Sequence, residues 1–234
     1  MIFYLLFSAI VVLIVKHIYE IHNTNKDATL EQLQSANKED IFEKLKERKP
    51  LLIHNLGNKN EEYNNLSFQK LSDDNPGLII HDRNRYVSLK SFVDEPQIYV
   101  NHNDNLCDSL RLNSLFNEIY DPFQSQIHCN KRNYLSLLKG KNMIPLTKSK
   151  NNLNLIYQIY GQTKLYLFNP KHIHDIKGKS NESIKKYGQK INLTQGLVLY
   201  IPVEWYYFYE SEDESILGEI TSDNYFTVIY NSLR

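Results

Sequence analysis

The sequence has little cysteine, and its cysteines are poorly spaced for a structural metal site. Its 234 residues include two cysteines, Cys107 and Cys129. One pair can form one disulfide, which is not the disulfide framework of a small secreted domain, and a chain of this length can bury a core without one. Neither cysteine belongs to a Cys-x-x-Cys pair, so a structural zinc site is not expected. We expect two free thiols, with one disulfide as the alternative.

The chain also lacks an excess of charge of either sign. Lys and Arg together number 27, Asp and Glu together number 27, and the formal net charge at pH 7 is +0. A protein that binds nucleic acid through the phosphate backbone needs a basic face. The composition therefore predicts no nucleic-acid partner.

Short motifs of common catalytic sites are absent too. The sequence contains no G-x-S-x-G, Walker loop, G-x-G-x-x-G or H-E-x-x-H. Cys129 adjoins His128, but neighbours on a strand point to opposite faces, so a Cys–His nucleophile is not expected. His172 and His174 follow Pro170 and are interpreted as part of a solvated loop. The isolated histidines are expected to be ordinary polar or core side chains: His54, His81, His102 and His128.

One long apolar run is present, at the N-terminus. Residues 2–15 read IFYLLFSAIVVLIV, without a charge, and weaker apolar character continues to residue 21. The run is short for a span of about 20 residues, but no small-residue cleavage site follows it. We expect an uncleaved single-pass membrane anchor over residues 1–21, which contacts the membrane through residues 2–21. A signal peptide and a buried core helix are the alternatives.

The flanking charges give an expected orientation for this anchor. Lys16 and Lys26 lie on its C-terminal side, and the positive-inside rule then places the main domain in the cytosol. Candidate N-glycosylation sites at Asn65, Asn181 and Asn192 would be used only if the domain faced a lumen.

The rest of the chain predicts a polar linker over residues 22–36 and one β-rich domain over residues 37–234. A helix is expected to begin at Asn37 as its cap and to end at Pro50, and residues 106–120 alternate in a helix-like way. Predicted strands cover 51–56, 77–82, 96–100, 134–138, 153–161, 163–168, 196–202, 205–210, 215–221 and 225–230. Short strands at close spacing favour a sandwich or a barrel.

Four segments, in this order, resemble segments of the JmjC/cupin-like 2-oxoglutarate oxygenases. They read EKLKERKPLLIHNL (43–56), NLIYQIYGQTKLYLFNP (154–170), GLVLYIPVEWYYF (196–208) and SDNYF (222–226). The matching positions are Asn154, Gly161, Pro170, Gly196, Pro202, Trp205 and Asn224. The resemblance implies a mainly β (α+β) fold, a double-stranded β-helix or jelly-roll, with flanking helices.

The resemblance also implies where a metal would lie. In active members, a His-x-Asp pair and a distant His hold Fe(II). Here Lys148 and Lys150 take the positions of the pair, or Thr147 and Ser149 in a second register, and Tyr207 takes that of the distant His. A lysine ammonium has no lone pair to give a metal. No metal ligand and no catalytic residue are therefore expected.

The cosubstrate position is changed in the same way. Active members bind the far carboxylate of 2-oxoglutarate through a Lys or similar group, and this chain has Thr163 there. A vestigial pocket is expected at Asn154, Thr163, Trp205, Tyr207 and Asn224. Trp205, Tyr207 and Tyr209 share one strand face, which the resemblance directs into the barrel interior, where they would fill the space of the iron and cosubstrate.

The sequence thus predicts a membrane-anchored, catalytically inactive JmjC/cupin-like domain that acts in binding or scaffolding. No cofactor is expected, and the partner, a protein or a small ligand, is unknown. Two alternatives stay open. One is an active hydroxylase dependent on Fe(II) and 2-oxoglutarate with a non-standard site, and the other is a barrel that binds another small ligand, such as a sugar or a lipid headgroup.

Overall fold

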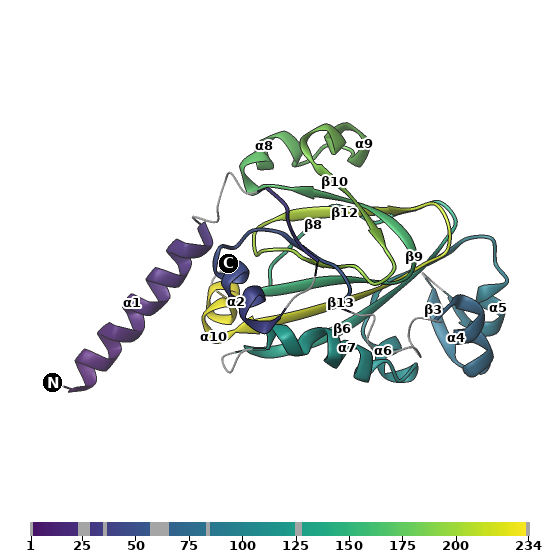
Figure 1. Ribbon diagram of the computed structural model, residues 1–234, viewed down its shortest axis with the longest axis horizontal. Helices are drawn as coiled ribbons and strands as arrows, with labels where there is room; N and C mark the ends of the chain where they lie inside the picture. The colour runs from purple at the N-terminus through teal and green to yellow at the C-terminus, as the bar shows by residue number, and fades with distance from the viewer. Residues whose placement is uncertain are drawn as a thin grey trace.

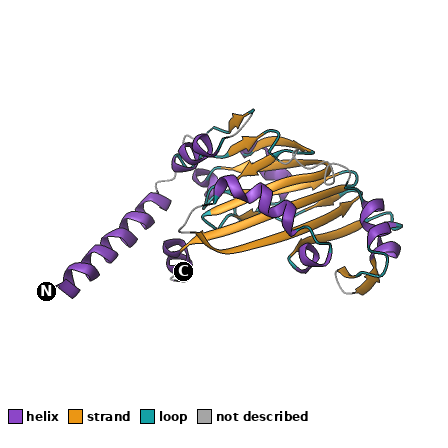
Figure 2. Ribbon diagram, turned by 60° about the horizontal axis from the view of Figure 1, so that its bottom comes forward, coloured by secondary structure: helices purple, strands orange, loops and turns teal. Residues whose placement is uncertain are grey.

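The computed structural model describes residues 2–22, 29–34, 37–56, 66–82, 85–124 and 128–232. These residues form a mixed α/β fold around a large, mostly antiparallel sheet, an arrangement compatible with a β-sandwich (Figure 1). Figure 2 shows helices packed along one face of the strands.

The helices are α1 (Ile2–His22), α2 (Lys38–Lys46), α4 (Phe68–Asp74), α5 (Leu89–Val93), α6 (Asn105–Ser109), α7 (Asn113–Tyr120), α8 (Ile173–Ile176), α9 (Asn181–Ile184) and α10 (Tyr225–Ser232), with 3-10 turns η1 (Asp121–Phe123), η2 (Pro170–His172) and η3 (Lys185–Tyr187). The strands are β1 (Glu31–Leu33), β2 (Leu51–Ile53), β3 (Ile79–Asp82), β4 (Arg85–Ser88), β5 (Ile98–Asn103), β6 (His128–Lys139), β7 (Asn142–Met143), β8 (Thr147–Lys148), β9 (Leu153–Phe168), β10 (Gln189–Thr194), β11 (Val198–Tyr200), β12 (Tyr206–Ser211) and β13 (Ser215–Asn224).

Strand β9 divides the large sheet into two parts. Its first half pairs with β11 and β13 and belongs to the major sheet, in the order β1-β2-β11-β9-β13-β6-β5. Its second half pairs with β10 and β12, and β12 also pairs with β7 and β8, which together form the minor sheet. Gly161, between the halves, has a φ of +74°, a backbone conformation that glycine adopts without steric cost.

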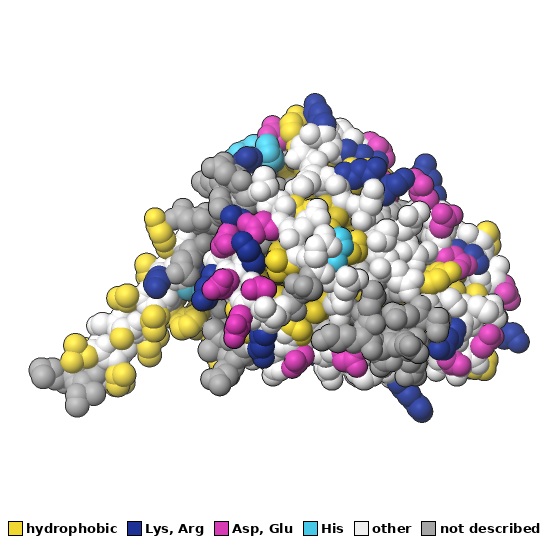
Figure 3. Space-filling view, viewed as in Figure 1, with side chains coloured by type: hydrophobic (Ala, Val, Ile, Leu, Met, Phe, Trp, Pro, Cys, Tyr) yellow, Lys and Arg dark blue, Asp and Glu magenta, His cyan; other side chains and the backbone are white. Residues whose placement is uncertain are grey.

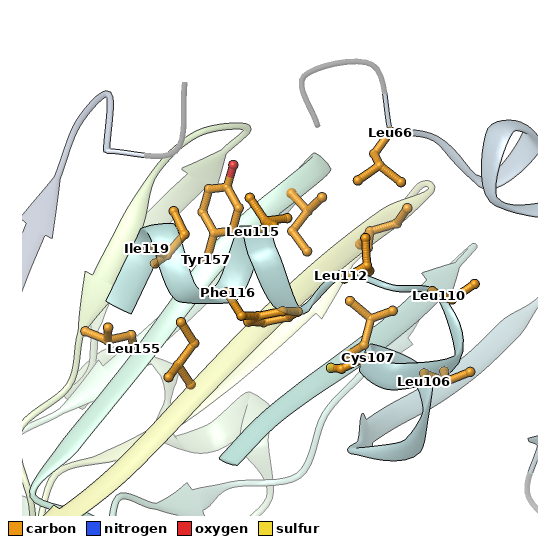
Figure 4. Close-up of a cluster of buried hydrophobic side chains, with 14 of the residues drawn as sticks. Leu66, Leu106, Cys107, Leu110, Leu112, Leu115, Phe116, Ile119, Leu155 and Tyr157 are labelled. Atoms are coloured by element: carbon orange, nitrogen blue, oxygen red, sulfur yellow. The ribbon is translucent and has the colours of Figure 1, made fainter. Parts of the chain in front are cut away.

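The alternation of side chains along these strands produces separate cores. One core lies between the major sheet and helices α4 to α7; in Figure 4, Leu115, Phe116 and Ile119 of α7 lie over Leu155 and Tyr157 of β9. A second core lies between the two sheets and takes Trp205, Tyr207 and Tyr209, so the prediction that these aromatics share an inward face is confirmed. A third lies outside the minor sheet, against α8 and α9.

The structure confirms some of the predicted elements and corrects others. The helix after Asn37 is α2, and the Asn37 side chain accepts from the Asp40 amide at 2.8 Å. Residues 225–230, predicted as a strand, form helix α10, because Asn224 Oδ1 accepts from the Thr227 amide at 2.8 Å and caps the first turn. Residues 153–161 and 163–168 are one continuous strand, and β1 lies within the predicted linker.

The predicted membrane anchor is wrong. Residues 2–22 do form helix α1, but no helix in the described part of the chain is long and apolar enough to cross a membrane. The uncharged run ends at Val15 and, at 1.5 Å per residue, spans about 21 Å of a hydrocarbon core of about 30 Å. The predicted single-pass location is therefore wrong too, and the cytosolic orientation depended on that anchor.

Helix α1 projects from the sheets and contacts α10 near its C-terminal end (Figure 1). His17 Nε2 lies 3.1 Å from Thr227 Oγ1, and Ile18 packs against Val203 and Tyr230. Apolar side chains remain exposed along α1, while Lys and Arg are interspersed with Asp and Glu on the rest of the face in Figure 3.

Candidate functional site

A cavity of about 770 Å³ lies between the two sheets, and polar side chains from both sheets line it. The major sheet contributes Asn154 from β9 and Glu219 and Thr221 from β13. The minor sheet contributes Lys148 from β8 and Tyr207 from β12. The volume falls within the range of small-molecule pockets, about 300–1,000 Å³.

The period of two along β13 explains why the interior changes from apolar to polar at this end. Leu217 belongs to the core between the sheets, and Glu219, Thr221 and Asp223 follow it at alternate positions on the same face. The intervening Ile220 belongs to the core on the opposite face. One strand therefore supplies both the apolar interior and one wall of the cavity.

A hydrogen-bond network forms the floor of the cavity. The Tyr207 hydroxyl donates to Glu219 Oε1 at 3.0 Å, and Asn154 Nδ2 donates to the same hydroxyl at 3.3 Å. His102 Nδ1 lies 3.1 Å from Glu219 Oε2. Burial, with the charge of Glu219 adding to it, raises the pKa of Tyr207 well above the ordinary value of 10.0, so the phenol keeps its proton.

His102 reaches the cavity through an irregularity in β5. The register between β5 and β6 shifts between Val100 and Asn103, and His102 has a φ of 54°. Its ring stacks on Tyr134 with centroids 3.5 Å apart. A left-handed backbone is uncommon for a residue other than glycine and is frequent at functional sites.

The cationic side chains of the cavity differ in their partners. Lys148 Nζ forms an ion pair with Glu204 at 2.7 Å and lies over the Tyr206 ring. Arg132 and Lys150 also line the cavity, and neither makes an ion pair or a side-chain hydrogen bond with the described residues. The rim therefore carries two cations outside ion pairs, Arg132 and Lys150, and Arg132 lies near enough to the Asp223 carboxylate to influence its pKa.

Asp223 lies at the same rim and binds the adjoining loop. Its carboxylate accepts from Asn151 Nδ2 at 2.9 Å and from the Asn152 amide at 3.1 Å. Burial raises the pKa of Asp223, against the opposing effects of these donors, Arg132 and His128. Both carboxylate oxygens are thus engaged by the loop.

No known protein family and no curated protein matches this chain.

The donor set of the cavity does not fit the Fe(II) centre that the resemblance implies. Lys148 is paired with Glu204, and Tyr207 is a protonated phenol that donates to Glu219. His102 and Glu219 are hydrogen-bonded to each other, and the described residues contain no group of three or more His, Cys, Asp or Glu side chains suited to a metal. The facial triad needs two imidazoles and a carboxylate on one ion.

The position expected for the 2-oxoglutarate lysine also does not fit that role. Thr163 is buried and bonds Gln158 Oε1 at 2.6 Å, and its hydroxyl lies 2.9 Å from Ser215 Oγ. It does not line the cavity. These two bonds engage the Thr163 hydroxyl beside the point where β9 passes from one sheet to the other.

The other predicted site residues fall into two groups. Those that line the cavity are Thr147, Lys148, Lys150, Asn154 and Tyr207. Three others do not line it. The Ser149 hydroxyl donates to the Ile201 carbonyl, and Trp205 is buried in the core between the sheets. Asn224 caps α10.

The candidate glycosylation sites and the cysteines lie elsewhere. Asn181 is half-buried and donates to the Ile144 carbonyl at 3.4 Å, Asn192 is exposed on β10, and Asn65 lies outside the described residues. Both thiols are free, and burial raises the pKa of Cys107 to about 12.

Sequence reasoning missed His102 and Glu219 as site residues. His102 was expected to be an ordinary isolated histidine, and the bulge that turns it into the cavity leaves no clear sequence signal. Glu219, in contrast, was detectable: it is a charge at an inward position of a predicted apolar strand, where an unpaired carboxylate is costly.

Proposed function

We propose that residues 37–234 form a JmjC/cupin-like double-stranded β-helix domain that binds a small polar ligand and does not act as an iron oxygenase. The resemblance of four ordered segments supports the family. Two sheets that share the bent strand β9, with a core between them, agree with the proposed fold. The cavity lies where the resemblance places the metal-binding residues of active relatives.

The observation that carries the proposal is the cavity itself. Tyr207, which takes the position of the distant histidine in the resemblance, is a large side chain that could have filled the space. It is buried, yet a cavity of about 770 Å³ is present beside it. The aromatic side chain therefore forms part of a cavity wall and does not fill the space. The hydrogen bonds among Tyr207, Glu219 and Asn154 fix these polar side chains before a ligand binds. Such preorganisation favours specific binding, because less conformational entropy is lost on binding.

A cavity-blocking variant tests this function. The full chain is screened by thermal shift against a library of small polar metabolites, and hits are measured by calorimetry. Thr147 is exposed and lines the cavity, so Thr147→Trp is expected to abolish binding. Thr194→Trp, exposed at the end of β10, is the matched control and is expected to bind normally.

Two results would overturn the proposal. Binding that survives Thr147→Trp would place the ligand outside the cavity. Stoichiometric iron in the purified chain, together with turnover of 2-oxoglutarate, would instead identify an active oxygenase with a different ligand set.

A further inference from the structure

The orientation of the Asn154 amide follows from its neighbours. The Tyr207 hydroxyl has one proton, and it donates that proton to Glu219 Oε1 at 3.0 Å. The hydroxyl can then only accept from Asn154, which must present Nδ2, at 3.3 Å. The reverse orientation would set the amide oxygen against an oxygen with no proton to give.

Asn154 Oδ1 is consequently a buried acceptor without a partner. The residue is 2% exposed and lines the cavity, and no group of the described chain donates to this oxygen. Buried polar atoms in folded proteins nearly always have a hydrogen-bond partner. The oxygen is itself shielded from solvent, so the vacant acceptor favours a ligand whose N–H or O–H donor reaches it through a small shift of the Asn154 side chain.

Glu219 adds a second acceptor to the same floor. Each carboxylate oxygen has one bond in the network, Oε1 to Tyr207 and Oε2 to His102. A carboxylate has about four lone-pair sites, so capacity remains for a further donor. An anionic oxygen beside a vacant amide oxygen favours a cationic donor such as an ammonium group.

The rim of the cavity, in contrast to its floor, favours an anionic group. Arg132 and Lys150 line it without an ion pair among the described residues, whereas Lys148 is neutralised by Glu204 and Asp223 is bound by its loop. In the β6–β13 register Arg132 pairs with Thr221, and Tyr134 pairs with Glu219. Arg132 therefore lies diagonally across from Glu219, within reach of a long side chain, but among the described residues Glu219 forms its ion pair with His102 and none with Arg132.

We propose that the ligand is a small zwitterion with its ammonium group at Glu219 and Asn154 Oδ1 and its anionic group at Arg132 and Lys150. This inference rests on the proposed function. A simple anion would meet the Glu219 carboxylate at the floor, and a simple cation would meet the two unpaired cations at the rim. A compact molecule with both charges satisfies both ends at once.

The first test compares ligands that differ by one charge. Glycine, β-alanine, 4-aminobutyrate and phosphoethanolamine are titrated into the full chain by calorimetry, with n-butylamine and butyrate as singly charged controls. At least one zwitterion is expected to bind about tenfold or more tightly than both controls, the usual effect of a charged hydrogen bond. Equal or tighter binding of either control would overturn the inference.

The second test removes one charge of the protein at a time. Glu219→Gln and Arg132→Gln are each expected to weaken zwitterion binding about tenfold or more, because each removes one charged contact. Arg132 is exposed, so Arg132→Gln is expected to fold even if Glu219→Gln does not. Lys190→Gln, exposed on β10 away from the cavity, is the matched control. Unchanged affinity in Arg132→Gln would contradict the placement of the anionic group.

The outcomes separate this inference from the proposed function. If neutral polyols or singly charged molecules bind and Thr147→Trp blocks them, the cavity is a ligand site and the zwitterion assignment is wrong. If neither the library nor any probe binds, both proposals fail.

Discussion

Tyr207 and Glu219 are joined by a hydrogen bond that links the two sheets, with the phenol donating to Oε1 at 3.0 Å. Tyr207 belongs to β12 of the minor sheet and Glu219 to β13 of the major sheet. The bond explains how a buried tyrosine can lie beside the cavity and still leave it open. The ring packs in the core, and the hydroxyl orders the floor.

Removal of this hydroxyl is expected to destabilise the fold. Tyr207→Phe leaves Glu219 Oε1 and Asn154 Nδ2 without their partner, and we expect the free energy of unfolding to fall by about 1–3 kcal/mol in urea denaturation. Tyr225→Phe is the control, because Tyr225 is exposed on α10. Equal stability of the two variants would show that the bond contributes nothing.

The bend of β9 is expected to require glycine for two separate reasons. Gly161 and Gly178 both have a φ of +74°, but a Cβ at Gly161 would lie 2.1 Å from the Glu214 carbonyl oxygen, and one at Gly178 meets nothing within 4 Å. Gly161→Ala is therefore expected to lower the free energy of unfolding by about 1–3 kcal/mol more than Gly178→Ala. Similar losses in thermal or urea unfolding would mean that the backbone relaxes and removes the clash.

The inward face of the aromatic segment could be predicted from the sequence because it depends on local alternation. Trp205, Tyr207 and Tyr209 recur with a period of two, and the structure places all three in the core between the sheets. The cap at Asn37 is local in the same way, because its side chain bonds an amide three residues on.

Features that depend on tertiary contacts could not be predicted from the sequence. Residues 225–230 are rich in aromatic and β-branched types, which favour a strand, yet they form α10, with the Asn224 cap at one end and a contact with His17 of α1. The position of His102 depends on a shift of register between β5 and β6. The unpaired Asn154 oxygen depends on a proton donated between sheets, which no sequence pattern encodes.

The polar cluster at the bend of β9 is expected to contribute to stability and not to binding. Thr163→Val preserves shape but removes the hydroxyl that bonds Gln158 and Ser215, so the free energy of unfolding should fall by about 1–3 kcal/mol. Affinity for a cavity ligand should not change, because Thr163 does not line the cavity. Thr194→Val, at an exposed site, is the stability control, and altered affinity in Thr163→Val would contradict the assignment.

His128 is expected to make stability fall in mild acid. Burial lowers its pKa from the ordinary value of 6.5, against the opposing charge of Asp223. In the unfolded chain the imidazole takes up its proton near pH 6.5, while in the folded protein it does so only at lower pH. The neutral His128 therefore makes its full contribution to the free energy of unfolding above pH 6.5. That contribution is lost as the pH falls through the pKa of His128 in the folded protein.

Urea unfolding at a series of pH values between 7.5 and 5 tests this linkage. His128 Nδ1 lies 3.1 Å from the Tyr120 hydroxyl, and a glutamine amide can keep that bond without titrating. His128→Gln should therefore flatten the dependence of the unfolding free energy on pH. His174→Gln, at an exposed site, should retain it. If the slope of His128→Gln matched that of the unaltered chain, the acid sensitivity would arise from another group, such as Asp223.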